Sequence, residues 1–421
     1  MKMFLRAVLI FLFFWSFYLA EAKAQESLTW DDCVREAKKN HPDLISAQER
    51  LNQAKSNKAV SMSNILPQVT SDLTQTTSKV AGNEKADTYS YSVNARQLVF
   101  DGFKNFYDIR AAAENVKSSE YNYESTSADV RLRLRTAFVR LLRAQELSEI
   151  TEDIAKRRKQ NLELVKLRYE AGREHKGSLL TAQANLAEAE FEIAQARRNI
   201  SLAKRQLIKE LGRIKQATIR VEGDFDVKST FAEAPDFEEL AESNPVLKDL
   251  IAQTSQARFD LKSSRAEFFP EVYANASSGR TASDWPPQQD RWSAGVSLSF
   301  PIFEGGSRIA KVSGAKAAFN QSQADQRSGR DTVVLALEMA WLNLQDSIGR
   351  LQVEQKFLEA TQERAKITQA QYSTGLISFD NWTIIEDDSV RAKKSFLEAR
   401  VNALIAEADW LKAQGRTLDE E

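Results

Sequence analysis

The chain has 421 residues, of which 28% are charged, yet its formal net charge at pH 7 is only -1. This balance disfavours a nucleic-acid-binding surface, which needs a clustered basic excess. With only 8 Pro and 15 Gly, long stretches are free of helix breakers. The two histidines, His41 and His175, and the single Cys33 form no metal-ligating or nucleophilic pattern. The composition therefore predicts neither an enzyme nor a cofactor.

The first residues predict a secretory signal peptide over 1–24. Lys2 and Arg6 flank the start of an apolar run that ends at Ala20, and cleavage is expected before Gln25. A permanent membrane anchor is the alternative. No later run approaches the ~20 apolar residues that a membrane-spanning helix needs. We therefore expect the mature chain to leave the cytoplasm without such a helix.

The rest of the chain repeats itself, because equivalent residues such as Pro42 and Pro245 lie 203 positions apart. A repeat of this length is no solenoid unit of about 20–50 residues, but a duplicated structural half. The halves are predicted over 25–212 and 237–421, joined by a linker at 213–236. The same spacing relates Leu66-Pro67-Gln68-Val69 to Phe269-Pro270-Glu271-Val272, Tyr169 to Tyr372, and Gly172 to Gly375.

Each half begins with a helix and continues, after Pro67 or Pro270, into an antiparallel hairpin. The hairpins are predicted at about 68–98 and 271–300, since their second strands alternate apolar and polar residues with period two. A sheet on a soluble core is the alternative. Strands of about 10–12 residues instead match tilted membrane strands. The residues predicted to face lipid are Tyr89, Tyr91, Val93, Trp292, Val296, Leu298 and Phe300.

Beyond each hairpin a glycine-containing junction predicts a sharp change from strand to helix. Long amphipathic helices follow at about 103–171 and 307–372, and each would extend roughly 100 Å at 1.5 Å per residue. Return helices are predicted at about 178–211 and 378–414. The junction residues are Phe100, Asp101 and Gly102 in the first half and Phe303, Glu304 and Gly305 in the second.

Four membrane strands cannot close a barrel, because open edges are not tolerated in lipid and single-chain barrels begin at eight strands. Several copies must therefore share one barrel. Two copies would give eight strands with an interior filled by side chains, and three would give 12 strands around a water-filled lumen. A barrel continued by long helices is a conduit that reaches from a membrane into the adjoining compartment.

In this order of elements the sequence resembles the TolC family of bacterial outer-membrane efflux proteins. The resemblance covers nearly the whole mature chain and rests on motifs in a fixed order. It implies an α+β membrane protein: a homotrimer with a 12-stranded barrel in a Gram-negative outer membrane and a helical coiled-coil tunnel in the periplasm. The motifs are Asn-His-Pro-Asp-Leu (40–44), Asn-Pro-Val-Leu (244–247), Val-Phe-Asp-Gly (99–102), Ile-Phe-Glu-Gly-Gly (302–306), Arg-Tyr-Glu-Ala-Gly (168–172) and Gln-Tyr-Ser-Thr-Gly (371–375).

The resemblance also implies a gate, because the family's Tyr-x-x-Gly turns lie at the closed tip of the tunnel. An inner-membrane transporter and a periplasmic adaptor open that tip. Many members carry an Asp nine positions after the second Tyr; here Asn381 occupies that position and Asp380 precedes it. The charged run 173–176 forms closing ion pairs or a solvated tip, and the sequence leaves both open. The candidate gate residues are Tyr169, Gly172, Arg173, Tyr372, Gly375, Asp380 and Asn381.

The resemblance implies an export duct of a pump. The alternatives are a type I protein secretion duct of the same architecture and a structural coiled-coil protein of the envelope without a channel.

Overall fold

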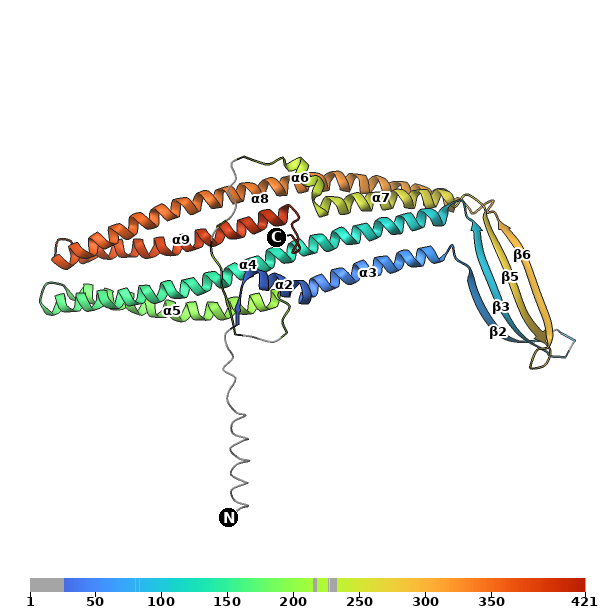
Figure 1. The fold of residues 1–421 in the computed structure, drawn as a ribbon, viewed down its shortest axis with the longest axis horizontal. Helices are drawn as coiled ribbons and strands as arrows, with labels where there is room; N and C mark the ends of the chain where they lie inside the picture. Colours follow the sequence, from blue (N-terminus) through green and yellow to red (C-terminus); the bar gives the residue numbers. More distant parts are fainter. Residues whose placement is uncertain are drawn as a thin grey trace, which may run out of the picture.

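The fold is elongated, with a sheet at one end and long paired helices that run to the other (Figure 1). The computed structural model describes residues 26–420, except 80, 83, 215–217, 226 and 228–232. The signal peptide predicted over 1–24 lies outside the described residues.

Helices make up most of the molecule, and the two longest, α4 and α8, contain 67 and 68 residues. At 1.5 Å per residue each extends about 100 Å. None of the described helices has an apolar stretch long enough to cross a membrane. In chain order the helices are α2 (Trp30–Asn40), α3 (Pro42–Ser63), α4 (Lys104–Glu170), α5 (Lys176–Glu210), α6 (Phe237–Ser243), α7 (Pro245–Ala266), α8 (Ser307–Thr374) and α9 (Phe379–Ala413).

The two halves bury equivalent side chains midway along the long helices. Phe138 of α4 and Trp341 of α8 are 2% and 6% exposed, and they occupy the same position in the two halves. Gly212 ends one return helix so close to the start of α3 that a Cβ would lie 2.2 Å from the Asn40 carbonyl oxygen. A Cβ on Gly415 would lie 2.2 Å from Pro245 at the start of α7. The duplication therefore extends to tertiary packing.

Four antiparallel strands form one sheet in the order β2-β3-β5-β6. The pairing of β3 with β5 joins the two predicted hairpins into a single sheet, with β2 and β6 at its edges (Figure 1). The strands are β2 (Gln68–Ser78), β3 (Ala86–Phe100), β5 (Glu271–Ala282) and β6 (Gln289–Ser299).

Part of the predicted linker is ordered against the first half. β1 (Glu26–Leu28) pairs in parallel with β4 (Ile219–Val221), and Ile219 and Val221 are buried. The Gln145 side chain of α4 donates to the Val221 carbonyl at 3.0 Å and accepts from its N–H at 3.1 Å. Strands of three residues are too short to show a period of two, so the sequence pattern did not indicate them.

Candidate channel wall, junction and tip

The pairing register of the four strands gives the sheet one mainly apolar face, which also holds the ion pair between Arg280 and Asp290 beside Tyr91. Val93 lies between Ser71 and Ser278, and Ser278 lies opposite Trp292. Trp292, Val296 and Leu298 are 79%, 74% and 68% exposed. Tyr89 and Tyr91 share this face, whereas Phe300 follows the last residue of β6.

The opposite face of the sheet is polar along its whole width. One row across the four strands contains Thr70, Asn94, Ser277 and Ser293. On this face Asn94 donates to Asp72 at 2.7 Å. An apolar face backed by a polar one is the arrangement of a strand wall between lipid and water.

The junction in the first half turns the chain through two successive left-handed residues. Gly102 has φ 68°, and Phe103, a residue that rarely adopts this region, has φ 70°. A Cβ on Gly102 would lie 2.4 Å from the Cβ of Phe269, so glycine is required at this close approach. The buried Asp101 accepts from the backbone N–H of Asn105 at 2.8 Å and thereby caps the first turn of α4.

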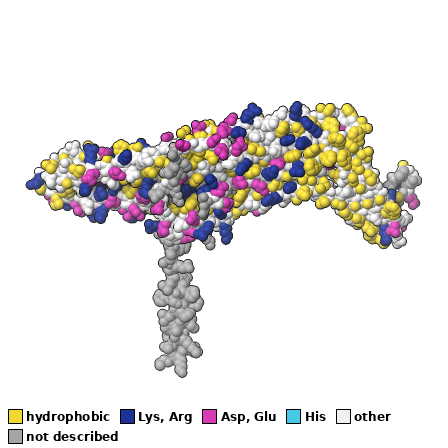
Figure 2. Space-filling model, turned by 45° about the horizontal axis from the view of Figure 1, so that its top comes forward, with side chains coloured by type: hydrophobic (Ala, Val, Ile, Leu, Met, Phe, Trp, Pro, Cys, Tyr) yellow, Lys and Arg dark blue, Asp and Glu magenta, His cyan; other side chains and the backbone are white. Residues whose placement is uncertain are grey.

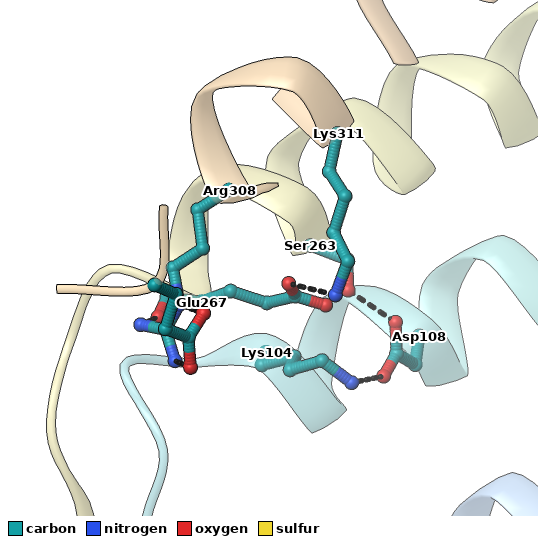
Figure 3. Close-up of polar contacts among 7 residues, drawn as sticks. Lys104, Asp108, Ser263, Glu267, Arg308 and Lys311 are labelled. Atoms are coloured by element: carbon teal, nitrogen blue, oxygen red, sulfur yellow. Dashed lines mark hydrogen bonds and ion pairs between the residues drawn. The ribbon is translucent and has the colours of Figure 1, made fainter. Parts of the chain in front are cut away.

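The second junction has the same backbone geometry, with Gly305 at φ 61° and Gly306 at φ 84°. Glu304 accepts from Arg308 Nε at 2.8 Å, while the neighbouring Phe303 is 87% exposed. Polar contacts link the helices beneath the sheet, as Figure 3 shows: Lys311 of α8 pairs at 3.2 Å with Glu267, which directly follows α7, and Ser263 of α7 donates to Asp108 of α4. These contacts hold α4, α7 and α8 together where they meet the strands.

At the far end both helical turns close through a glycine in the left-handed region. The N–H of Gly172 (φ 70°) donates to the Tyr169 carbonyl at 2.9 Å, and the N–H of Gly375 (φ 82°) donates to the Tyr372 carbonyl at 3.0 Å. In each turn the N–H of the next residue donates to the carbonyl of the residue five positions earlier, Arg173 to Arg168 and Leu376 to Gln371, as in a Schellman motif. The turns are thus built alike in both halves.

Tyr372 lies at the centre of a packed cluster that joins the two turns. Its ring is fully buried and stacks on Trp382 with centroids 4.2 Å apart. Its hydroxyl donates to Glu174 of the other turn at 3.0 Å. Arg168 donates to the Tyr372 carbonyl at 2.7 Å and lies 4.6 Å from the ring centroid. Burial, together with the bond to Glu174, raises the pKa of Tyr372, so the phenol stays protonated at neutral pH.

The other candidate gate residues lie outside this cluster. Tyr169 occupies the position equivalent to Tyr372, yet it is 38% exposed. Arg173, Asp380 and Asn381 are exposed, and Asn381 only donates its backbone N–H to the Ser378 cap of α9 at 3.4 Å. Within the run 173–176 it is Glu174 that contacts the second turn.

Sequence reasoning missed three residues of the cluster, namely Arg168, Trp382 and Phe379. The sequence held a signal for them, because the two halves differ at these positions. At the spacing of 203, Arg168 corresponds to Gln371, Trp382 to Leu179 and Phe379 to Lys176. The aromatic residues that bury Tyr372 therefore exist in only one half.

An apolar sheet face joined to helices of about 100 Å that end in a packed tip defines the class of export channels of the outer membrane. The chain belongs to the outer membrane efflux protein family, whose family model matches residues 33–213 and 237–416. These two stretches fall within the two structural halves. Family membership confirms the resemblance, the export-duct function and the Gram-negative outer-membrane location predicted from the sequence.

Known proteins of this kind are similar over most of the chain. The alkaline protease secretion protein AprF of Pseudomonas aeruginosa is 25% identical over 308 residues, which cover 69% of this chain but only 64% of AprF, less than two thirds of its length. The pyoverdine export outer membrane protein OpmQ of the same species is 23% identical over 414 residues, covering 91% of this chain and 84% of OpmQ. Both are named for export and not for catalysis.

The crystal structure of the Campylobacter jejuni CmeC outer membrane channel is similar with a TM-score of 0.82 at 17% identity. The match covers 93% of this chain and 87% of CmeC. At this identity the likeness shows the fold alone, and it confirms the predicted α+β architecture of helical tunnel and strand domain.

Proposed function

We propose that three copies of this chain form one export channel, in which each copy contributes four strands to a 12-stranded barrel. The apolar sheet face carries this proposal, because contact with lipid would stabilise side chains as exposed as Trp292 and Val296. Within the described chain the edge strands β2 and β6 each have one partner. An unpaired backbone group in lipid costs several kcal/mol, so neighbouring copies must pair these edges.

The lipid-facing residues of this barrel are Tyr89, Tyr91, Val93, Trp292, Val296, Leu298 and Phe300. The polar face, including Asn94 and Ser297, lines the lumen. The junctions at Phe100–Gly102 and Phe303–Gly305 redirect each strand into the wall of a helical tunnel, about 100 Å long, in the periplasm.

The channel works with a periplasmic adaptor and an inner-membrane transporter. The tip lies one full helix length from the sheet, where it can meet proteins anchored in the inner membrane. It also carries exposed apolar side chains on α8, on α9 and in the turn between them, namely Ile367 (52%), Ile384 (59%) and Leu376 (75%). Such a surface is typical of a site of contact with other protein chains.

The cluster around Tyr372 holds the tunnel closed. It bonds the α8–α9 turn to the α4–α5 turn through Arg168 and Glu174, so opening requires these contacts to separate. Tyr169, Gly172, Arg173 and Gly375 belong to the same tip. Asp380 and Asn381, exposed at the start of α9, form the polar entrance that cargo meets first.

Similarity to AprF favours a second candidate, a duct for protein secretion, whereas similarity to OpmQ favours a small exported molecule. Family membership leaves the alternative of a structural protein without a channel unsupported.

Light scattering of the mature protein in detergent tests the shared barrel. We expect a trimer that withstands mild detergent and a monomer that does not fold stably on its own. A monodisperse folded monomer would contradict the proposal.

A further inference from the structure

The outer surface of the helices next to the sheet combines aromatic and basic side chains. Ring contacts connect this surface to the apolar sheet face. Phe100 of β3 pairs with Val272 of β5 on the apolar face of the sheet. The ring of Phe100 lies 6.0 Å from the ring of Phe103. One turn further along α4, the Arg110 guanidinium lies 5.2 Å from the ring of Phe106. Because residues three and four apart share a helix face, Phe103, Phe106 and Arg110 form one stripe that continues the apolar sheet face.

α7 extends this surface beside α4. The Phe106 and Tyr107 rings lie 5.6 Å apart, and Lys262 lies 5.7 Å from the ring of Tyr107. Arg258 and Arg265 are exposed and lie four residues before and three residues after Lys262, on the same side of α7. We name Arg110, Arg258, Lys262 and Arg265 the basic collar.

The charge of the basic collar is not neutralised by ion pairs in the described part of the chain. Of the nearby acids, Asp108 pairs with Lys104 and Glu267 with Lys311, as Figure 3 shows, whereas Asp260 of α7 forms no ion pair within the described residues. The whole chain has a net charge of only -1, so this local excess is not a property of its composition. Figure 2 shows Lys and Arg side chains next to the hydrophobic surface at the strand end.

The basic collar lies at the depth of lipid headgroups. Arg110 is six residues from the start of α4, and Arg258 is eight from the end of α7, which places both within about 12 Å of the strands. Each headgroup layer is roughly 5–8 Å thick, and long basic side chains reach further along the surface. α4 and α7 continue the inner strands β3 and β5, so copies that pair through β2 and β6 leave this surface open.

We propose that the basic collar binds the phosphodiester headgroups of anionic phospholipids in the periplasmic leaflet of the outer membrane. The proposal rests on the membrane channel proposed above and adds the lipid chemistry that it selects. The aromatic stripe packs against the upper acyl chains, and the four cations attract the phosphates. The lipid contact would fix the height of the channel in the membrane.

Electron spin resonance with spin-labelled lipids tests this selection. The channel, reconstituted in phosphatidylcholine vesicles, is compared for its association with labelled phosphatidylglycerol and labelled phosphatidylcholine. We expect the wild type to prefer phosphatidylglycerol about threefold, and 1 M NaCl to reduce this preference. The preference should disappear in a variant with the four substitutions Arg110→Gln, Arg258→Gln, Lys262→Gln and Arg265→Gln.

A control variant removes the same charge from exposed positions far along the tunnel and should keep the wild-type preference. Its substitutions are Lys156→Gln, Lys159→Gln, Arg205→Gln and Lys366→Gln. No preference in the wild type, or equal loss in both variants, would overturn the proposal. Displacement of the labelled lipid by millimolar inorganic phosphate would show a free-anion site instead. Ion conductance of the same vesicles tests the proposed channel separately from the proposed lipid site, because a variant that no longer selects phosphatidylglycerol should still form a conducting pore.

Discussion

The contacts of Tyr372 give the sharpest prediction about the tip. Tyr372→Phe removes the hydroxyl that donates to Glu174 at 3.0 Å but keeps the ring stacked on Trp382. A hydrogen bond to a charged group contributes about 1.5–3 kcal/mol. The lower value applies here, because Ser178 still donates to Glu174 at 2.9 Å in the variant.

The trimer multiplies this loss. If three tips open together, Tyr372→Phe shifts the equilibrium between closed and open tunnel by about 4–5 kcal/mol, or roughly a thousandfold. Arg168→Ala removes a charge-assisted bond to the Tyr372 carbonyl and a cation–π contact, and should add about 2 kcal/mol per chain.

Single-channel recording in planar bilayers measures the effect. We expect Arg168→Ala with Tyr372→Phe to raise the mean conductance or the open fraction severalfold without any partner protein. Arg173→Ala removes the same charge from an exposed position five residues further along the chain and should conduct like wild type. If the double variant assembles as a trimer and conducts like Arg173→Ala, the Tyr372 cluster does not form the gate.

Three further predictions concern the wall, the entrance and the pH dependence of the tip. Val296→Arg should impair membrane insertion, since a lipid-facing cation costs about 2–4 kcal/mol at the midplane. Ser297→Arg, on the opposite face, should insert normally and reduce conductance. Equal yields of the two variants in membrane fractions would refute the assignment of the two sheet faces. Asp380→Ala should weaken the block of current by multivalent cations added from the periplasmic side, measured by titration in bilayers, and an unchanged block would exclude Asp380 from the entrance. Burial raises the pKa of Glu386, so the folded tip binds this proton more tightly than the unfolded chain does, and its stability falls as pH rises through that pKa. Glu386→Gln should therefore raise the melting temperature at pH 7.5 and raise it less at pH 4.5. An increase that does not depend on pH would show that the charge of Glu386 is not its cause.

The sequence predicts the elements of this fold because their periods are long and uninterrupted. α4 and α8 bury residues three and four apart over many turns, and β3 and β6 alternate their side chains between two faces. Tertiary contacts decide the rest. Tyr169 and Tyr372 stand in similar motifs, yet the second alone is buried, because Trp382 and Phe379 pack against it. A parallel pair such as β1 and β4 joins segments that no local pattern relates.

Single-channel recording of the wild-type trimer tests the central claim, that this chain forms a gated duct across the outer membrane. We predict discrete current steps that are small while the tips are closed and that increase when protease removes the turns at 171–175 and 375–378. A monodisperse trimer that inserts into the bilayer and passes no ion current before or after this cleavage would contradict the account.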